Sequence, residues 1–294
     1  MSSRETVLIT GSSSGFGRLI GETLARKGYT VFATMRNIEG KNAAAAREIR
    51  ELAKKESLDL QVLELDVTQD ASVERAVAEA ARKTGRIDVA VNNAGYGVIG
   101  LTEAITSEQA HRIMDTNFIG AMRVNRAVLP WMRRQKSGLL LHVSSGAGRL
   151  AIPGMAYYCA SKSAMEAVAE TYRYELAPQG IDSVIVQPGA YPTAVFGNLE
   201  HAADASRNDD YGAVAAIGDR VIGQLGASTA NPQDLADAVV QIIETPAGKR
   251  NGRYRISAAG GLGIDEINAV CERVQQQVLQ AFGLIDLVRF RSAG

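Results

Sequence analysis

The sequence is poor in the residues that build disulfide frameworks and metal centres. Its 294 residues include only two cysteines, Cys159 and Cys271, which are too few for a disulfide-stapled fold. The three histidines, His111, His142 and His201, show no ligand spacing such as HxxxH. We therefore interpret them as surface or core residues and predict no metal site.

An excess of one charge and long apolar runs are lacking as well. Lys+Arg and Asp+Glu each total 32, so the formal net charge is zero and nothing indicates nucleic acid or an anionic membrane as a partner. No stretch approaches the ~20 apolar residues that a membrane-spanning helix needs. The opening segment has too short an apolar run for a signal peptide. A cytoplasmic protein that acts on a small molecule is expected.

The sequence does contain a regular alternation of short β-branched runs with longer amphipathic stretches. Strands are predicted at residues 7–10, 30–35, 60–67, 87–93, 139–145 and 181–188. Helices are predicted at 15–27, 41–56, 70–84, 107–136, 155–177, 231–245 and 264–282, with Asn231 as the cap of the sixth. Strands that are apolar on both sides are typical of a parallel sheet covered by helices. The pattern predicts an α/β fold with a doubly wound parallel sheet, whose ligands bind at the carboxyl edge of the strands.

This regularity ends after Gly189. Residues 190–230 are rich in Gly, Ala, Asn and Asp and show little hydrophobic periodicity. Such a segment at the functional edge is typical of a lid over a substrate, and a surface insertion without a role is the alternative. No internal repeat or linker is present, so we predict a single domain over residues 1–294, with the lid at 190–230 and a C-terminal helical extension at 260–294.

A glycine-rich turn, VLIT-GSSSGFG, follows the first predicted strand. A Cβ at its glycines would obstruct both the sharp turn and the approach of a phosphate to N–H groups at the next helix's N-terminus. The position between a strand and a helix favours dinucleotide binding over a Gly/Ser turn that binds nothing. The predicted cofactor-binding residues of this turn are Gly11, Ser13, Ser14, Gly15, Phe16 and Gly17.

The glycine spacing is TGxxxGxG, and further motifs follow it in order. They are Asn92-Asn93-Ala94-Gly95, Asn117, Ser145, YxxxK from Tyr158 to Lys162, and PGxxxT from Pro188 to Thr193. In these residues the sequence resembles the short-chain dehydrogenase/reductase superfamily, over roughly residues 5–260. The resemblance implies a Rossmann fold of about seven strands with helices on both faces. It also implies hydride transfer between a nicotinamide dinucleotide and a carbonyl or alcohol. TVFATMRN and NNAGYG favour the hydroxysteroid and retinol dehydrogenase branch.

The end of the second predicted strand bears on the choice between NADP(H) and NAD(H). An acid there would accept hydrogen bonds from the adenosine ribose and repel a 2′-phosphate. This chain reads Thr34-Met35-Arg36-Asn37, without an acid, and the Arg36 guanidinium suits a phosphate. The alternative is an exposed loop arginine without a ligand. We predict NADP(H) as the cofactor.

The resemblance implies the remaining cofactor contacts. Asp66 and Val67 would contact the adenine. The alternative is that Asp66 is a capping residue at the start of a helix. Asn93, Ala94 and Gly95 would lie along the adenosine ribose. The nicotinamide carboxamide would be held by Pro188, Gly189, Tyr191 and Thr193.

Two tyrosines, Tyr157 and Tyr158, compete for the role of acid. Tyr158 and Lys162 are four residues apart in a predicted helix, so they share one face. Tyr157 is turned about 100° around the axis and is expected to pack or to line the pocket. A nearby ammonium favours the phenolate and brings the phenol pKa closer to neutral pH, where proton transfer is effective. By resemblance, Lys162 also binds the nicotinamide ribose.

Ser145 and Asn117 complete the predicted catalytic set. Ser145 is expected to bind the substrate oxygen and stabilise its developing negative charge, with Ser144 as the alternative. The resemblance gives Asn117 the role of a helix-kinking asparagine whose main chain holds a water against Lys162. A solvent-facing helix residue is the alternative for Asn117.

Together these residues predict an NADPH-dependent oxidoreductase that reduces a hydrophobic ketone or aldehyde reversibly, with the proton coming from Tyr158. The apolar wall is expected to contain Val98, Ile99, Leu150, Ile152, Met155 and Phe196. A non-catalytic NADP(H)-binding regulatory protein is the alternative, and the presence of both Tyr158 and Lys162 disfavours it. By resemblance, the helices at 107–136 and 155–177 are expected to pair in a homodimer or homotetramer.

Overall fold

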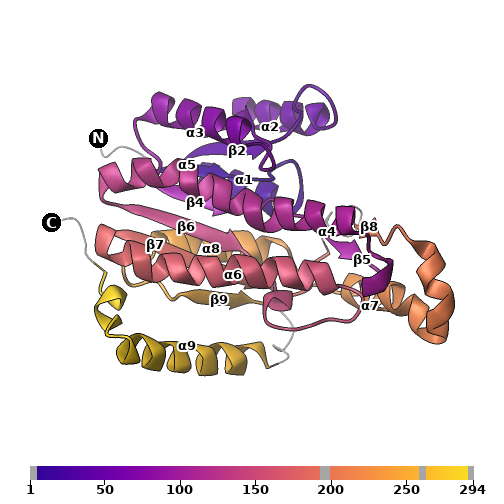
Figure 1. The fold of residues 1–294 in the computed structure, drawn as a ribbon. Helices are drawn as coiled ribbons and strands as arrows, with labels where there is room; N and C mark the ends of the chain where they lie inside the picture. The colour runs from indigo at the N-terminus through magenta and orange to yellow at the C-terminus, as the bar shows by residue number, and fades with distance from the viewer. Residues whose placement is uncertain (1–4, 193–198, 258–262, 291–294) are drawn as a thin grey trace.

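A single parallel sheet of seven strands organises the chain (Figure 1). The computed structural model describes residues 5–192, 199–257 and 263–290, so Thr193 and Phe196 of the predicted site lie outside the described residues. The sheet order is β3-β2-β1-β4-β6-β7-β9. Its strands are β1 Thr6–Ile9, β2 Thr30–Met35, β3 Leu60–Glu64, β4 Val89–Asn92, β6 Gly138–Val143, β7 Ile181–Pro188 and β9 Arg253–Ile256. From β1 the chain adds β2 and β3 on one side of the sheet and then crosses to the other side of β1 to form β4. The strand order therefore reverses between β1 and β4, and a ligand is expected to bind at this point of the carboxyl edge.

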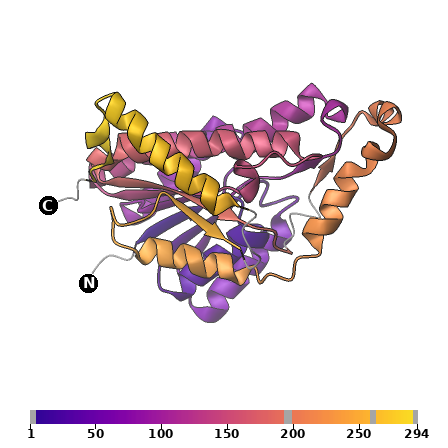
Figure 2. The same cartoon turned by 90° about the horizontal axis from the view of Figure 1, so that it is seen from below.

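Helices cover both faces of this sheet. The α-helices of the described residues are α1 Gly15–Arg26, α2 Ala43–Glu56, α3 Asp70–Thr84, α4 Ser107–Met114, α5 Gly120–Gln135, α6 Ala156–Leu176, α7 Ile217–Gly226, α8 Gln233–Glu244 and α9 Ile264–Ala281. Residues of α1, α2 and α8 share one buried apolar cluster with the sheet, and residues of α3, α5 and α6 share a second. Figure 2 shows the sheet between the α6 layer and α8. The predicted doubly wound fold is confirmed.

The buried pattern of the strands explains why most of them were predictable. Every residue of β1, β2, β4, β6 and β7 is buried, as two-sided coverage by helices requires. The edge strand β9 differs, because all four of its residues are only half-buried. Its sequence, RYRI, does not carry the apolar run of the other strands, and it was not predicted.

The segment that follows β7 has its own anchor at the carboxyl edge. A short strand, β8 Glu200–His201, pairs in parallel with β5 Val98–Ile99. A run of 3₁₀ turns at Ala205–Ala216 then leads into α7. Asn231, predicted as the cap of the next helix, accepts from the Gln233 N–H at 3.1 Å, but the helix begins at Gln233 and Pro232 holds its N-cap position.

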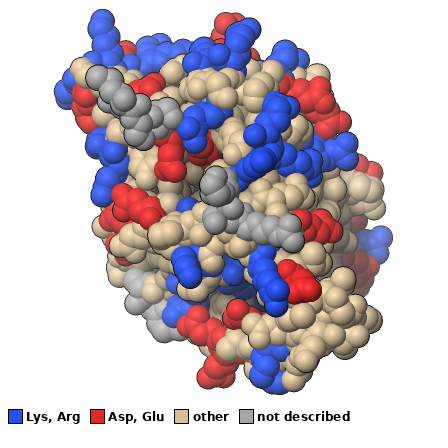
Figure 3. All heavy atoms as spheres, turned by 90° about the vertical axis from the view of Figure 1, so that its left-hand side faces the viewer, with Lys and Arg blue, Asp and Glu red and all other residues tan. Residues whose placement is uncertain are grey.

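The surface matches the balanced charge of the sequence. On the face that holds both termini, Lys and Arg are interspersed with Asp and Glu (Figure 3). Within residues 5–192, 199–257 and 263–290, no helix combines the length and the apolar character that crossing a membrane would need.

Candidate active site

The glycine turn between β1 and α1 is built by close backbone approach. Gly11 has φ +70° and Gly15 has φ +56°, conformations that favour glycine. A Cβ on Gly11 would lie 2.8 Å from the Cα of Ala94. Asn93 fixes the turn from the other side, because its Nδ2 donates to the carbonyls of Thr10 and Gly11 at 2.9 and 3.1 Å. The structure therefore brings the two predicted cofactor motifs into direct contact.

The start of α1 has the properties of an anion-binding helix N-terminus. The Ser14 side chain accepts no capping hydrogen bond from the described part of the chain, and the first turn contains no acid. The N–H groups at this end therefore lack an internal partner and carry the positive end of the helix dipole. Ser13 is half-buried and Ser14 is exposed beside them. These donors, together with the space left by the glycines, fit the diphosphate of a dinucleotide.

Arg36 extends from the end of β2 into solvent. Its side chain forms no ion pair or hydrogen bond with the described residues, so its guanidinium is available to a ligand. An acid also lies at this edge, because Glu64 of β3 accepts a hydrogen bond from the Asn37 N–H at 3.0 Å. Glu64 was missed in the sequence analysis, because it belongs to the neighbouring strand rather than to the end of β2.

Asp66 acts as a local cap in the structure. Its Oδ1 accepts hydrogen bonds from both the N–H and the hydroxyl of Thr68, at 2.9 and 2.8 Å. These bonds close a turn over residues 66–68, whereas α3 begins at Asp70 with Gln69 as its N-cap, and contact of Asp66 with an adenine stays a prediction. Val67 is buried against Gly120, where a Cβ would come within 2.8 Å of the valine.

The end of β7 approaches the glycine turn through two aromatic rings. Tyr191 is buried and meets Phe16 edge to face, with 5.4 Å between the ring centroids. The Tyr191 hydroxyl is buried without a hydrogen-bond partner among the described residues. Next to it, the Gly189 N–H donates to the carbonyl of Ile256 at 2.8 Å. Two residues predicted from distant parts of the sequence, Phe16 and Tyr191, are thus in direct contact.

Tyr158 and Ser145 meet at the start of α6. The serine hydroxyl acts to lower the pKa of Tyr158, but burial of the phenol outweighs this and raises the pKa. The Ser145 Oγ also accepts from the Ala147 N–H at 3.1 Å. Tyr157, one residue earlier on α6, packs with Tyr158 against the cluster of Val98, Ile105 and Ile113.

Lys162 is almost completely buried one turn after Tyr158. Its Nζ donates to the carbonyl of Val143 at 2.9 Å and lies 5.8 Å from the centroid of the Tyr158 ring. Burial lowers the pKa of Lys162 to about 8, and the charge of Glu166 acts in the opposite direction. The expected lowering of the Tyr158 pKa is therefore not what the structure gives, since the ammonium points to a carbonyl and desolvation of the phenol dominates.

Asn117 lies at the centre of a π-helical turn, Asp115–Ile119, that interrupts the helix predicted at 107–136. It is buried, so the solvent-facing alternative is wrong. Its Nδ2 donates to the carbonyl of Tyr96 and to the hydroxyl of Ser161, at 2.9 and 3.0 Å. Its Oδ1 is close to Gly95, where a Cβ would lie 3.0 Å from it and 3.7 Å from Lys162 Nζ. Asn117 thereby joins the 94–97 segment to α6.

The apolar side of the site differs in part from the expected wall. Val98 and Ile99 are fully buried in β5, which pairs with β8, and do not face open space. The ring of Tyr158 belongs to the same apolar cluster as α7, which contributes Val221, Ile222 and Leu225. The periodic apolar residues of α7 were the signal that could have identified this contact.

A cavity of about 470 Å³ lies along the 149–153 loop and α6. Leu150 and Ile152 of the predicted wall line it together with Ala156 and Cys159. Within the described residues, no group of three or more His, Cys, Asp and Glu side chains is arranged to hold a metal ion.

Ser144 is directed away from Tyr158. Its hydroxyl donates to Oε1 of Glu166 at 2.7 Å, so Ser145 rather than Ser144 faces the phenol. The buried Glu166 was missed in the sequence analysis, although its position four residues after Lys162 could have identified it as a residue on the same helix face.

Comparison with known proteins places these features in a family context. The family model described as short chain dehydrogenase matches residues 5–204. The chain is 33% identical over 239 residues to 3-ketodihydrosphingosine reductase of Bacteroides thetaiotaomicron, covering 81% of this chain and 83% of that protein. It is 38% identical over 199 residues to retinol dehydrogenase 8 of Homo sapiens, covering 66% and 61%. For 17-beta-hydroxysteroid dehydrogenase type 1 of Homo sapiens, the identity is 35% over 210 residues, covering 68% and 62%.

Solved structures have the same architecture. A short-chain dehydrogenase from Streptomyces avermitilis superposes with a TM-score of 0.78 at 28% identity, covering 96% of this chain and 98% of that one. A variant actinorhodin polyketide ketoreductase with NADPH gives a TM-score of 0.74 at 26% identity, covering 90% of this chain and 98% of that one. A 3-ketoacyl-(acyl-carrier-protein) reductase from Brucella melitensis with NADH gives 0.70 at 25% identity, covering 87% and 97%. Neighbours of this fold thus include complexes with either nicotinamide cofactor.

Proposed function

This chain belongs to the short-chain dehydrogenase/reductase superfamily of oxidoreductases, and from that premise we propose that it is an NADPH-dependent reductase of hydrophobic ketones or aldehydes. The observation that carries the proposal is that the Ser145 hydroxyl is close enough to the Tyr158 phenol to act on its pKa, with Lys162 buried one helical turn away. The reaction is reversible, and its product is the alcohol.

The chain offers a binding position for each part of the cofactor. The glycine turn and the N-terminus of α1 would bind the diphosphate, and Arg36 would bind the 2′-phosphate. The 93–95 segment would lie along the adenosine ribose, and Lys162 would bind the nicotinamide ribose. The Tyr191 hydroxyl, which is buried without a hydrogen-bond partner among residues 5–192, 199–257 and 263–290, would face the nicotinamide end together with Gly189. A bound reduced nicotinamide supplies the hydride that carbonyl reduction requires.

The catalytic side chains divide the remaining work. Because the Ser145 Oγ accepts from the Ala147 N–H, its own proton is free to point at a substrate oxygen. Burial keeps the Tyr158 phenol protonated at neutral pH, which is the state needed to donate a proton to that oxygen. The oxidation direction needs the phenolate, which burial disfavours.

The apolar surroundings support a hydrophobic substrate. Ile152, Met155 and the α7 side chains pack around Tyr158, with the 190–230 segment as the lid. The names of the relatives agree with this choice, since they include a 3-ketodihydrosphingosine reductase, a retinol dehydrogenase and a hydroxysteroid dehydrogenase.

A carbonyl panel tests the function directly. Purified protein is mixed with NADPH or NADH and with aromatic, alicyclic, steroid and long-chain 3-keto carbonyls, while the absorbance of the reduced nicotinamide is followed. Oxidation of NADPH with apolar carbonyls is expected. Tight NADPH binding without turnover on the whole panel would overturn the proposal in favour of a regulatory NADP(H)-binding protein.

Assembly and location form a separate part of the proposal. We expect a cytoplasmic homodimer or homotetramer that pairs through α4, α5 and α6. Light scattering after gel filtration measures the mass, and a monomer would contradict this expectation.

A further inference from the structure

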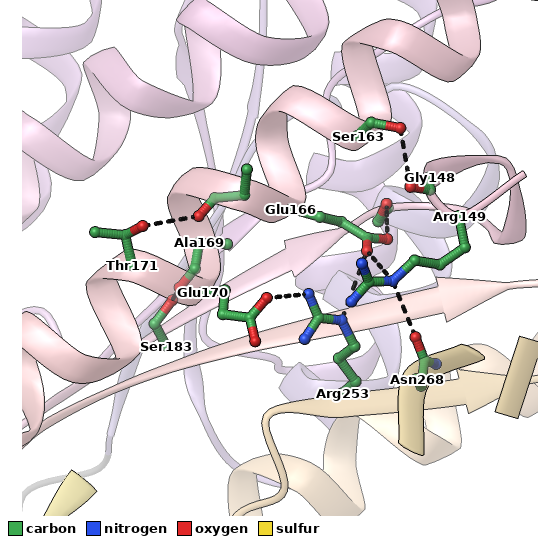
Figure 4. A network of polar contacts seen from close by, with 12 residues as sticks. Gly148, Arg149, Ser163, Glu166, Ala169, Glu170, Thr171, Ser183, Arg253 and Asn268 are labelled. Carbon is green, nitrogen blue, oxygen red and sulfur yellow. Dashed lines mark hydrogen bonds and ion pairs between the residues drawn. The ribbon is translucent and has the colours of Figure 1, made fainter. Parts of the chain in front are cut away.

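Glu166 is a buried carboxylate that the proposed reaction does not use. It is 2% exposed and lies on α6, one turn after Lys162. It accepts hydrogen bonds from the Ser144 hydroxyl at 2.7 Å and from Gln187 Nε2 at 2.9 and 3.0 Å. Two guanidinium groups also face it, those of Arg149 and Arg253, with Nε–Oε2 distances of 3.3 and 3.6 Å (Figure 4).

The partners of Glu166 adjoin the segments that form the active site. Ser144 directly precedes Ser145, and Gln187 directly precedes Pro188-Gly189 at the end of β7. Arg149 lies in the loop that runs from Ser145 to Tyr158. One carboxylate thus holds together the end of β6, the end of β7, the 146–155 loop and α6.

The C-terminal helix α9 completes this network. The Oδ1 of Asn268 accepts from Arg149 Nε at 3.0 Å, and its Nδ2 donates to Gln187 Oε1 at 2.7 Å. Ile264, at the start of α9, covers Gly146, where a Cβ would lie 2.7 Å from the isoleucine Cδ1. Side chains of α9 therefore contact both the loop that follows Ser145 and the end of β7 (Figure 4).

We propose that Glu166 and Asn268 are positioning residues, which hold Ser145 and the end of β7 in register with the Tyr158–Lys162 face of α6. The inference rests on the proposed function, because these are the groups that would act on the carbonyl. Through Asn268, the C-terminal helix takes part in setting the geometry of the reaction centre rather than serving only as an extension.

The physical reason lies in the cost of burying a carboxylate. A buried charge is retained when paired charges and hydrogen bonds compensate its desolvation, and each donor to Glu166 is then fixed in place. A displacement of about 1 Å in a reacting group can lower a rate ~10²-fold. Glu166 also places a negative charge beside Lys162. This charge raises the pKa of Lys162, whereas burial lowers it. The ionisable groups that face this pair are Tyr158 on α6, Arg149 in the loop and Arg253 on β9.

The first test compares Glu166→Gln with Glu170→Gln. Glu170 lies one turn further along α6 and accepts from Arg253 at 2.6 Å, without contacting Ser144 or Gln187. In Glu166→Gln, the new N–H₂ group would face the donors of Ser144 and Gln187 and displace them. We therefore expect kcat to fall on the order of 10- to 100-fold, with a smaller change in KM. The alkaline limb of the pH–rate profile should move to lower pH, because Lys162 loses its anionic neighbour. Glu166→Asp keeps the charge and should keep the limb.

Glu170→Gln should change neither kcat nor the alkaline limb of the pH–rate profile. Equal losses in the two glutamine variants, or an unmoved limb in Glu166→Gln, would mean that Glu166 is a structural ion pair only and would overturn the proposal. A readout without turnover is the titration of lysine labelled with ¹³C at Cε, in which the Lys162 signal is identified by its loss in Lys162→Arg. Its pKa should fall in Glu166→Gln and stay constant in Glu170→Gln.

Asn268→Ala tests the contribution of α9. Asn268 is only half-buried, so the variant should fold and show a thermal midpoint close to that of the wild type. Hydrogen exchange of the amides of residues 144–149 should become faster, and kcat should fall about tenfold. Unchanged exchange would refute the role of α9. If the wild type binds NADPH but reduces no carbonyl, the proposed function fails, while the lysine titration and the exchange measurement still decide this inference.

Discussion

Gly17 and Asn93 are in such close contact that a Cβ on the glycine would collide with the Nδ2 of the asparagine. The same Cβ would lie 2.5 Å from the carbonyl oxygen of Gly11, which accepts one of the two hydrogen bonds of Asn93. Gly17 is therefore required by packing between two motifs that stand about 80 residues apart in the sequence. The helix face that carries it is the one that would receive the diphosphate.

We predict that Gly17→Ala weakens NADPH binding and lowers the free energy of unfolding by about 1–3 kcal/mol, because the turn must move to make room. Gly21→Ala is the matched control on the same helix, since its Cβ would find neighbours only at 3.6 Å and beyond. This control should be stabilised by ~0.5–1 kcal/mol. Urea unfolding and fluorescence titration with NADPH measure both quantities. Equal behaviour of the two variants would show that the close contact does not constrain the turn.

The central sheet and the choice between neighbouring residues could be predicted from short-range rules. Strands with two buried faces have a continuous apolar pattern, so β1, β2, β4, β6 and β7 were identifiable. Helical periodicity selects Tyr158 over Tyr157, and the structure places Tyr158 against Ser145. Strand alternation places Ser144 and Ser145 on opposite faces, and the spacing to Tyr158 in the family that the sequence resembles favours Ser145; the structure directs Ser144 to Glu166.

The features that were not predictable depend on contacts across the chain. Arg253 and Arg255 make β9 look polar, but their guanidinium groups pair with Glu170 and Asp265, which come from α6 and α9. The sign of the Tyr158 pKa shift depends on burial of its ring, which no local pattern reports. Asn268 meets Gln187 across 81 residues of sequence, so its position in the network appears only when the helix packs.

Tyr158→Phe should abolish turnover while leaving NADPH binding intact. The variant removes the hydroxyl that would donate the proton, and loss of a general acid costs ~10²–10⁴-fold in kcat. Tyr157→Phe is the neighbouring control and should retain activity, because its ring packs against Val98, Ile105 and Ile113. Stopped-flow measurement of NADPH oxidation gives kcat for both. A Tyr158→Phe enzyme with the wild-type rate would refute the acid assignment.

Arg36→Asp should shift the cofactor preference from NADPH toward NADH. The exchange removes a charge-assisted contact with a 2′-phosphate, worth about 1.5–3 kcal/mol, and adds an acceptor for ribose hydroxyls. The ratio of kcat/KM for NADPH over NADH should fall by at least ~10-fold. Arg50→Asp, an exposed arginine on α2, carries the same charge change away from the cleft and should leave the ratio unaltered. If both variants shift the ratio equally, the effect is one of overall charge rather than of a phosphate site.

His142 should make the fold sensitive to mild acid. The ring is fully buried between Asn125 Nδ2, at 3.0 Å from Nε2, and the carbonyl of Val184, at 3.3 Å from Nδ1, and burial lowers its pKa from 6.5 to about 4. Below pH 6.5, His142 binds a proton in the unfolded chain but not in the folded chain. Its contribution to the free energy of unfolding should therefore be constant above pH 6.5. It should fall by at most about 3 kcal/mol as the pH drops toward 4. Unfolding free energies measured by urea titration between pH 4 and 8 test this, with His142→Gln expected to lose this part of the slope and the exposed His111→Gln to keep it. Identical slopes in His142→Gln and the wild type would show that the buried ring does not control acid sensitivity.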